Sequence, residues 1–254
     1  ASIVVLERSS YVSYANCGLP YFVGGVIAQQ SDLLLQTPAS LHARFELDVR
    51  VMNEVIRIDR GAKKVFVRDL EAEHNYELEY DALILSPGAQ PVVPPIPGIE
   101  RALTLRTVED VERIVTAVNA APKCAVVIGG GFIGVETAEN LAHRGIPTTI
   151  IEAMDQVLAP LDPEMAIPVA NEIRRNGVDL RLGVSVAAIR DGGVELSDGS
   201  IVAAEMVILA IGVRPDVTLA RDAGLEIGPR GGIHVDEMNR TSDRAIYAVG
   251  DAAE

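Results

Sequence analysis

The chain has 254 residues, 48% of them hydrophobic, and a formal net charge of −14. This hydrophobic content supports a sizeable core and excludes a disordered chain, and the length allows one large domain or two ordinary ones. The negative charge argues against nucleic acid or an anionic membrane as a broad-surface partner, but it is compatible with an anionic cofactor, because backbone amides at helix N-termini bind phosphate whatever the net charge.

The longest apolar runs, such as residues 206–213, are shorter than the ~20 residues that a membrane-spanning helix needs. Residues 1–8, ASIVVLER, carry charges too early for the apolar segment of a secretory signal peptide. Two cysteines cannot build a disulfide framework, and a reducing compartment is the default for such a chain. We therefore expect a cytoplasmic protein without a membrane span.

The N-terminal residues predict a strand followed by a helix that carries a cysteine. Residues 2–7, SIVVLE, are β-branched and end in Glu7, and residues 13–25 read SYANCGLPYFVGG. Asn16 is the predicted N-cap of a helix that has Pro20 in its first turn, which places Cys17 at a helix N-terminus. That position favours the thiolate form of Cys17 over the thiol.

The middle of the first half predicts a small β-structure and then a connection. Residues 47–80 contain short alternating segments that indicate an antiparallel sheet, and residues 81–91, DALILSPGAQP, begin with a buried strand. Residues 91–100 are rich in proline and indicate a linker. A helix is predicted over 107–120.

A strand, a glycine-rich loop, a helix and a second strand follow one another from residue 123 onward. Residues 123–128 predict a buried strand, GGGFIG (129–134) follows at once, and residues 135–145 predict an amphipathic helix that ends at Gly145. The next strand, TTIIE, ends in Glu152. A G-x-G-x-x-G pattern in this setting indicates dinucleotide binding, whereas the same glycines alone are a weak signal.

Each residue of this pattern has a physical role in binding a dinucleotide. Gly129 permits the tight turn, Gly131 lets the backbone approach a pyrophosphate, and Gly134 lets the helix pack closely on the strand. Glu152 is expected to accept hydrogen bonds from the adenosine ribose hydroxyls. This favours NADH over NADPH, because the residues that follow, AMDQ, contain no basic group for a 2′-phosphate.

An internal repeat relates the two halves of the chain. SIVVLE (2–7) is similar to PTTIIE (147–152), and DALILSPGAQP (81–91) is similar to EMVILAIGVRP (205–215), in the same order. In the second half the glycine pattern begins 152 − 129 = 23 residues before the acid. Counting the same distance back from Glu7 leads to a position before Ala1. We therefore expect that the phosphate loop of the first half is missing and that the chain begins inside a fold. Residues 184–204 predict further short strands.

Together these features resemble the pyridine nucleotide-disulfide oxidoreductases, flavoproteins with an FAD domain split around an NAD(P)H domain. The resemblance implies an α/β fold with two Rossmann-like dinucleotide-binding domains, each with a small antiparallel β-meander. It implies a first FAD segment at 1–98, an NAD(P)H domain at 99–213 and a second FAD segment at 214–254. By this resemblance we expect the family's C-terminal interface domain, which completes a homodimer, to be missing from these 254 residues.

The resemblance also implies the residues of both cofactor sites. TSDRAIYAVGD (241–251) is similar to the family's second FAD motif, in which Asp251 holds the ribityl chain, and SPG is similar to a loop near the FAD. Each of these residues could also be an ordinary turn, strand-end or helix residue. The FAD set is Glu7, Arg8, Ser86, Pro87, Gly88 and Asp251; the NADH set is Gly129, Gly131, Phe132, Ile133, Gly134, Glu136, Glu152 and Gly212; Ser13 and Asn16 are expected to bind substrate.

The single cysteine of SYANCGLPY determines which branch of the family the chain resembles. The branch with C-x-x-x-x-C uses an internal disulfide, but Phe22 occupies the partner position here. A lone cysteine in this setting is similar to coenzyme A-disulfide reductases and NADH-dependent persulfide or polysulfide reductases. The resemblance implies electron transfer from NADH through FAD to Cys17, which then reduces coenzyme A disulfide, coenzyme A persulfide or polysulfide.

Other interpretations of the chain stay open. Cys17 could instead cycle through a sulfenic acid, as in an NADH oxidase or peroxidase, or it could be a buried structural cysteine. The chain could also be a nucleotide-binding fragment with no activity of its own. Cys124 begins a core strand and is interpreted as packing. The sequence predicts no metal site, because His42, His74, His143 and His234 lack the spacing of metal ligands.

Overall fold

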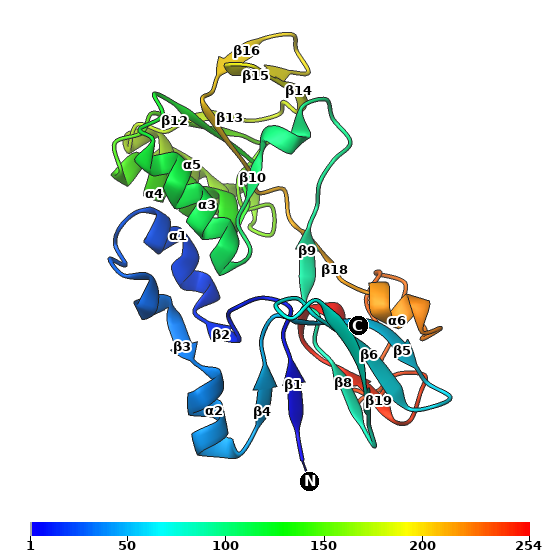
Figure 1. Cartoon of the computed structure of the whole chain (residues 1–254). Coiled ribbons are helices and arrows are strands. Elements are labelled where there is room, and N and C mark those ends of the chain that lie inside the picture. The colour runs from blue at the N-terminus through cyan, green and yellow to red at the C-terminus, as the bar shows by residue number, and fades with distance from the viewer. Residues whose placement is uncertain (1) are drawn as a thin grey trace. The chain divides into compact units, whose positions relative to one another are not determined.

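The computed structural model describes residues 2–254 (Figure 1), and its contacts divide the chain into two compact units. The first unit consists of Ala1–Tyr14, Leu34–Gln90 and Val213–Glu254, and the second of Ala15–Leu33 and Pro91–Gly212. Both units contain parallel strands and helices together with a small antiparallel sheet, so the predicted α/β class is confirmed. The predicted domain boundaries at 98 and 213 stay a prediction.

The second unit is built on a five-stranded parallel sheet with the order β10-β17-β11-β12-β13. Its central strands are short runs of aliphatic and β-branched residues that are almost entirely buried, as expected for a parallel sheet covered on both faces. The order is that of a Rossmann fold, because β11, the strand that leads into the glycine loop, lies at the centre and β10 lies at an edge. The strands are β10 (Leu103–Thr104), β11 (Ala125–Ile128), β12 (Thr148–Ile151), β13 (Asp179–Arg181) and β17 (Met206–Leu209).

Three helices accompany this sheet: α3 (Val108–Asn119), α4 (Phe132–His143) and α5 (Pro163–Arg175). The helix predicted over 107–120 is confirmed as α3, because Thr107 is its N-cap and exchanges capping-box hydrogen bonds with Asp110. The helix predicted over 135–145 is α4, which begins three residues earlier, directly at the glycine loop. Gly145 follows it with a φ of 76°, a value that glycine adopts without strain.

The predicted strands of 184–204 form an antiparallel sheet of β14 (Val186–Arg190), β15 (Gly193–Leu196) and β16 (Ile201–Ala203). Its buried residues Ile189, Val194 and Leu196 pack in one cluster with Val126 and Val207 of the parallel sheet. A short 3₁₀ helix, η3 (Ile99–Arg101), precedes β10.

Residues 15–33 also belong to the second unit. They form η1 (Asn16–Gly18), α1 (Leu19–Val23) and η2 (Gln30–Leu33). Leu19, Val23 and Leu33 are fully buried, and α1 packs against both α3 and α4. The segment that carries Cys17 is therefore anchored to the helices that flank the glycine loop.

The first unit contains two parallel pairs, β1 (Val4–Leu6) with β4 (Asp48–Arg50) and β8 (Leu83–Leu85) with β19 (Ile246–Ala248). The antiparallel sheet predicted over 47–80 is confirmed for its later part only. Residues 48–50 pair with β1 instead, because the chain turns after them at Met52, which has a φ of 56°. The antiparallel strands are β5 (Asn53–Asp59), β6 (Lys64–Asp69) and β7 (His74–Glu79).

Shorter elements complete this description. Strand β2 (Ser13–Tyr14) pairs with β3 (Leu34–Gln36), and β9 (Ala89–Pro91) pairs with β18 (Val213–Pro215). The helical elements of the first unit are α2 (Pro38–Phe45), α6 (Thr218–Asp222) and η4 (Gly250–Ala252). None of the helices within residues 2–254 is long and apolar enough to span a membrane.

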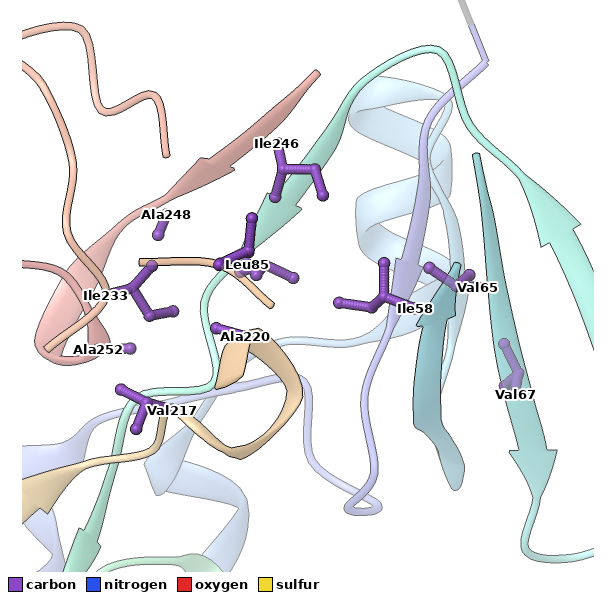
Figure 2. Close-up of a cluster of buried hydrophobic side chains, with 11 residues drawn as sticks. Ile58, Val65, Val67, Leu85, Val217, Ala220, Ile233, Ile246, Ala248 and Ala252 are labelled. Atoms are coloured by element: carbon purple, nitrogen blue, oxygen red, sulfur yellow. The ribbon is translucent and has the colours of Figure 1, made fainter. Parts of the chain in front are cut away.

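The core of the first unit joins segments that are far apart in the sequence. Figure 2 shows Ile58 and Val65 of the antiparallel sheet facing the same interior as Ala220 of α6 and Ile246 of β19. Ile233 and Ile246 are fully buried in this cluster. Hydrophobic burial therefore holds the last forty or so residues against the strands around residues 55–85.

The predicted internal repeat is confirmed by the strand order. The pair β1-β4 corresponds to β12-β13, and the pair β8-β19 corresponds to β17-β10. In the second unit β11 lies between β17 and β12 and hydrogen-bonds to both. No strand among residues 2–254 takes the corresponding position between β8 and β1.

Candidate functional site

The glycine loop between β11 and α4 has the geometry that its pattern predicts. Gly129 has a φ of 111°, and a Cβ there would lie 2.3 Å from the carbonyl oxygen of Ala210. A Cβ at Gly134 would lie 2.0 Å from the carbonyl oxygen of Gly129, so helix and strand pack too closely for any larger residue. Gly131 has no heavy atom within 4 Å of its ideal Cβ position. This opening is where a pyrophosphate can approach the backbone.

The first turn of α4 points its amides at the same opening. Gly131 is the N-cap, and no side chain caps the helix. The first amides therefore keep their hydrogens for an anion, and the helix dipole favours that anion. Phe132 is 60% exposed and Ile133 is 36% exposed, so Phe132 is not a core residue and is free to contact a ligand.

Glu152 follows β12, and both of its carboxylate oxygens are held by the backbone. Its Oε2 accepts a hydrogen bond from the N–H of Gly130 at 2.6 Å, and its Oε1 accepts one from the N–H of Met154 at 2.8 Å. The carboxylate is thereby fixed beside the glycine loop, where an adenosine ribose is expected. Ala153 and Met154 are exposed and carry no positive charge toward this position.

Glu136 lies one turn into α4 and is half-buried, not fully exposed. Burial, and then the negative charge of Glu139, hold the pKa of Glu136 above its ordinary value. A carboxyl group in this environment can take up a proton more readily than a solvated one. Gly212 has a φ of 114°, which favours glycine, and its carbonyl oxygen accepts a hydrogen bond from Val92 at 2.9 Å.

Glu7 occupies in the first unit the place that Glu152 occupies in the second. The N–H of Glu7 donates to the carbonyl of Arg50 at 3.0 Å, as that of Glu152 donates to Arg181 at 2.8 Å. The Oε1 of Glu7 accepts a hydrogen bond from the N–H of Ser9, two residues later, at 2.7 Å. The Oε1 of Glu152 accepts one in the same way from the N–H of Met154. The repeat thus extends to individual hydrogen bonds. Arg8 is exposed and lies 3.9 Å from the Glu54 carboxylate.

The remaining FAD candidates follow two paired strands. Ser86, Pro87 and Gly88 come after β8, and Asp251 comes after β19. Because β8 and β19 are parallel and hydrogen-bonded, these residues lie at the same edge of the sheet. Gly88 has a φ of 72°, and Asp251 is exposed within η4. The structure therefore brings these candidates together at one sheet edge. The Ser86 hydroxyl and the Asp251 carboxylate are groups that can hydrogen-bond to a polar cofactor.

Cys17 is exposed, so the interpretation of a buried structural cysteine is wrong. It lies in η1, directly before α1, and Pro20 is in the first turn of α1 as predicted. The prediction that Asn16 is the N-cap is wrong. Asn16 lies inside η1 and is exposed, and Ala15 precedes η1 without a side-chain cap, because the chain enters the helix through a 3₁₀ turn.

Other predicted residues are distributed over the two units. Ser13 lies on β2 of the first unit, whereas Asn16 belongs to the second. Cys124 is half-buried before β11, and its carbonyl accepts hydrogen bonds from Glu205 and Met206. Within the described residues no group of three or more His, Cys, Asp or Glu side chains could hold a metal.

The sequence did not reveal which residues anchor the Cys17 segment. Asn140 of α4 is 2% exposed and lies against Gly24, and Arg144 reaches the carbonyl of Val23 at 3.5 Å. These contacts join residues more than 110 positions apart. No local pattern in the sequence indicates these contacts, because they depend on the packing of α1 on α4.

The comparisons with known proteins agree with this geometry. Residues 1–254 match the family model described as pyridine nucleotide-disulphide oxidoreductase. The chain is 35% identical over 260 residues to an NADH oxidase of Methanocaldococcus jannaschii, an alignment that covers 99% of this chain and 57% of that protein. It is 31% identical over 256 residues to a coenzyme A disulfide reductase of Staphylococcus aureus strain JH9, covering 100% and 58%.

Solved structures are similar over the whole chain. The reduced CoADR-RHD of Bacillus anthracis has a TM-score of 0.98 and 47% identity, covering 100% of this chain and 46% of that one. An NAD-dependent persulfide reductase from A. fulgidus has a TM-score of 0.95 and 40% identity, covering 100% and 48%. The chain thus spans little more than half the length of the curated relatives that it matches. Because the family model matches it from end to end, the chain belongs to the pyridine nucleotide-disulphide oxidoreductase family.

Proposed function

We propose that the protein containing this chain is an FAD-dependent oxidoreductase that uses NADH to reduce coenzyme A disulfide, coenzyme A persulfide or polysulfide through Cys17. The observation that carries the proposal is an exposed cysteine with Phe22 five positions on, which removes an internal disulfide partner. The names of two relatives, coenzyme A disulfide reductase and persulfide reductase, support the same class of substrate. The domain boundaries and a homodimer remain parts of this proposal.

The described residues fit the two dinucleotides that this activity needs. Gly131 and the amides of the first turn of α4 would hold the NADH pyrophosphate, and Glu152 its adenosine ribose. Glu7, in the same hydrogen-bond frame, would hold the FAD ribose, and Asp251 its ribityl chain. When bound, FAD supplies the acceptor for the NADH hydride and the donor of two electrons to sulfur.

Cys17 supplies the nucleophile. Its thiolate would attack one sulfur of a coenzyme A disulfide, so that the S–S bond breaks, a Cys17–coenzyme A mixed disulfide forms and one coenzyme A thiolate leaves. Two electrons that come from NADH then break the mixed disulfide, release the second coenzyme A and regenerate the Cys17 thiolate. One proton from solvent and one hydride from NADH balance the two thiols formed. Ser13 and Asn16 would contact the substrate.

The proposal is tested with the full-length protein and the variant Cys17→Ser. NADH oxidation is followed with coenzyme A disulfide, coenzyme A persulfide or polysulfide as acceptor. We expect Cys17→Ser to lose turnover with all three, whereas Cys124→Ser, the matched control, keeps it. Full activity of Cys17→Ser on all three acceptors would rule the mechanism out.

The 35% identity to an NADH oxidase favours a second candidate. In this case Cys17 would react with peroxide, its sulfur would be oxidised to a sulfenic acid, and NADH-derived electrons would reduce it back to the thiol with release of water. Oxygen or peroxide consumption faster than reduction of every sulfur acceptor would select it. A colourless protein that still binds NADH would instead indicate a nucleotide-binding fragment.

A further inference from the structure

The segment that carries Cys17 has little stability of its own. Helix α1 has five residues, far fewer than the ~12 that an isolated helix needs in water. No residue of η1 is buried, so nothing directly around Cys17 fixes its position. The place of the thiol is therefore set by the contacts of α1 and η2 with the rest of the second unit.

One of these contacts joins Gly24, at the end of α1, to Asn140 of α4. A Cβ at Gly24 would lie 2.0 Å from Oδ1 and 2.8 Å from Cγ of Asn140. Asn140 cannot move away easily, because it is 2% exposed and its Nδ2 donates to the carbonyl of Glu136 at 2.8 Å. The amide group is thus held rigidly with its oxygen against the Gly24 backbone.

Two neighbours of Asn140 extend the contact. The ring Nδ1 of His143 lies 3.4 Å from the carbonyl oxygen of Gly24, and Arg144 Nη1 lies 3.5 Å from that of Val23. These oxygens are at the C-terminal end of α1, where positive charge and donors are favourable. Arg144 also donates to Asn119 of α3 at 3.0 Å, which ties the two supporting helices together.

Helix α4 therefore has a distinct task at each end. Its N-terminus forms the dinucleotide loop at Gly131, and its C-terminal turn holds α1. We propose that Asn140 is a positioning residue for Cys17, which acts through its contact with Gly24. This inference rests on the proposed role of Cys17 and adds the residue that sets where its thiol lies.

The contact predicts a compensating pair of substitutions. Gly24→Ala keeps an allowed backbone, since the φ of Gly24 is −69°, but its methyl group collides with the Asn140 amide. Asn140→Ala removes the colliding Oδ1 and Cγ and leaves only Cβ, 3.0 Å from the new methyl group, a close contact that a shift of a few tenths of an ångström relieves. The double variant should therefore restore the position of α1 that Gly24→Ala disturbs.

The test measures the alkylation rate of each cysteine by iodoacetamide in the full-length flavoprotein, reduced beforehand, with peptide mass spectrometry. We expect Gly24→Ala and Asn140→Ala each to change the Cys17 rate by about threefold or more, and the double variant to return it within about twofold of wild type. Cys124, in the same unit, should react at an unchanged rate. A general loss of stability would alter both cysteines.

Asn176→Ala is the control for loss of the hydrogen bond alone, because Asn176, the exposed residue that follows α5, donates from Nδ2 to the carbonyl of Glu172 one turn back at 2.9 Å. It should leave the Cys17 rate unchanged. Hydrogen exchange reports whether α1 has moved, since the amides of Gly24, Gly25 and Val26 bond within this segment. Faster exchange there with a Cys17 rate changed less than about threefold would overturn the proposal, as would additive effects in the double variant. Neither outcome depends on turnover, so it is distinguishable from failure of the proposed activity.

Discussion

The carboxylate of Glu152 accepts a hydrogen bond from the N–H of Gly130, inside the glycine loop, at 2.6 Å. The acid expected to bind the ribose is thus part of the same rigid structure as the loop expected to bind the pyrophosphate. Glu7 lacks such a partner among the described residues, although its frame is otherwise the same. The specificity of the second unit for its nucleotide can therefore be tested at one side chain.

Glu152→Gln should weaken NADH binding, because a charged acceptor for the ribose hydroxyls becomes a neutral one. We expect KM for NADH to rise roughly tenfold or more, from the loss of about 1.5–3 kcal/mol of charge-assisted hydrogen bonding. Glu152→Ala combined with Ala153→Arg should shift the preference toward NADPH. The control is Glu164→Gln, an exposed carboxylate of the same unit. The measurement is steady-state kinetics of each variant with NADH and with NADPH. An unchanged KM for NADH in Glu152→Gln would contradict a role of Glu152 in binding the ribose.

Alanine at Gly134 should lower stability, whereas alanine at Gly131 should lower NADH affinity. Gly134→Ala places a methyl group against the Gly129 carbonyl and should cost about 1–3 kcal/mol of unfolding free energy. Gly131→Ala meets no neighbour and should leave stability unchanged while NADH binding weakens, because the methyl group enters the space of the pyrophosphate. Thermal denaturation and NADH titration separate the two. A destabilised Gly131→Ala with normal NADH affinity would refute this assignment.

Glu136 should make stability fall as pH rises. Its pKa in the folded chain is raised, mainly by burial and to a lesser extent by the charge of Glu139. At pH values between the ordinary pKa and this raised pKa, the folded state therefore binds more protons than the unfolded state. Above that pH range the carboxylate is charged while partly buried, which lowers the free energy of unfolding. Glu136→Gln should therefore raise Tm at pH 7.5, and the gain should vanish at pH values below the ordinary pKa. Glu139→Gln should weaken the same dependence, and a gain that persists at low pH would contradict it.

Arg60 is a stability determinant of the first unit. Its Nε donates to Asp243 Oδ2 at 2.8 Å, and its Nη1 donates to the carbonyl of Gly224 at 3.0 Å. Arg60→Ala should cost about 1–3 kcal/mol. Two hydrogen bonds hold the pKa of Asp243 below its usual value. The larger effect comes from Arg60, and the smaller one comes from the N–H of Ala245.

The stabilisation from this lowered pKa is present above the ordinary Asp value and is lost as pH falls through the folded value. The effect of Arg60→Ala should accordingly be smaller at pH 3 than at pH 7, as measured by urea denaturation. Arg68→Ala, at an exposed position on β6, is the control and should change stability little. An effect of Arg60→Ala that is independent of pH would mean that only the carbonyl contacts matter.

The features predicted well from sequence are those that the chain encodes locally. The glycine loop after β11, the position of Glu152 directly after β12 and the helix near 107–120 are each specified by residues within one or two turns, and the structure has these elements where the sequence predicts them. The binding roles of the loop and of Glu152 stay predictions. The repeat could also be found, because two aligned strand-end patterns survive in the sequence.

The errors arose where a distant part of the chain decides. Residues 48–50 alternate like the strands after them, but β1 recruits them into a parallel pair. Asn16 has the composition of an N-cap, yet the 3₁₀ turn before α1 takes up that position. The pairing of Gly24 with Asn140 has no local signature at all, since only the packing of α1 on α4 creates it.

The grouping of residues 15–33 with the second unit has a consequence for folding order. During synthesis, α1 leaves the ribosome long before α3 and α4, the helices that bury Leu19 and Val23. Until those helices emerge, Leu19 and Val23 lack the two helices that pack on α1 in the folded unit. We therefore expect the segment around Cys17 to reach its folded position only after α4, which ends at His143, has been synthesised.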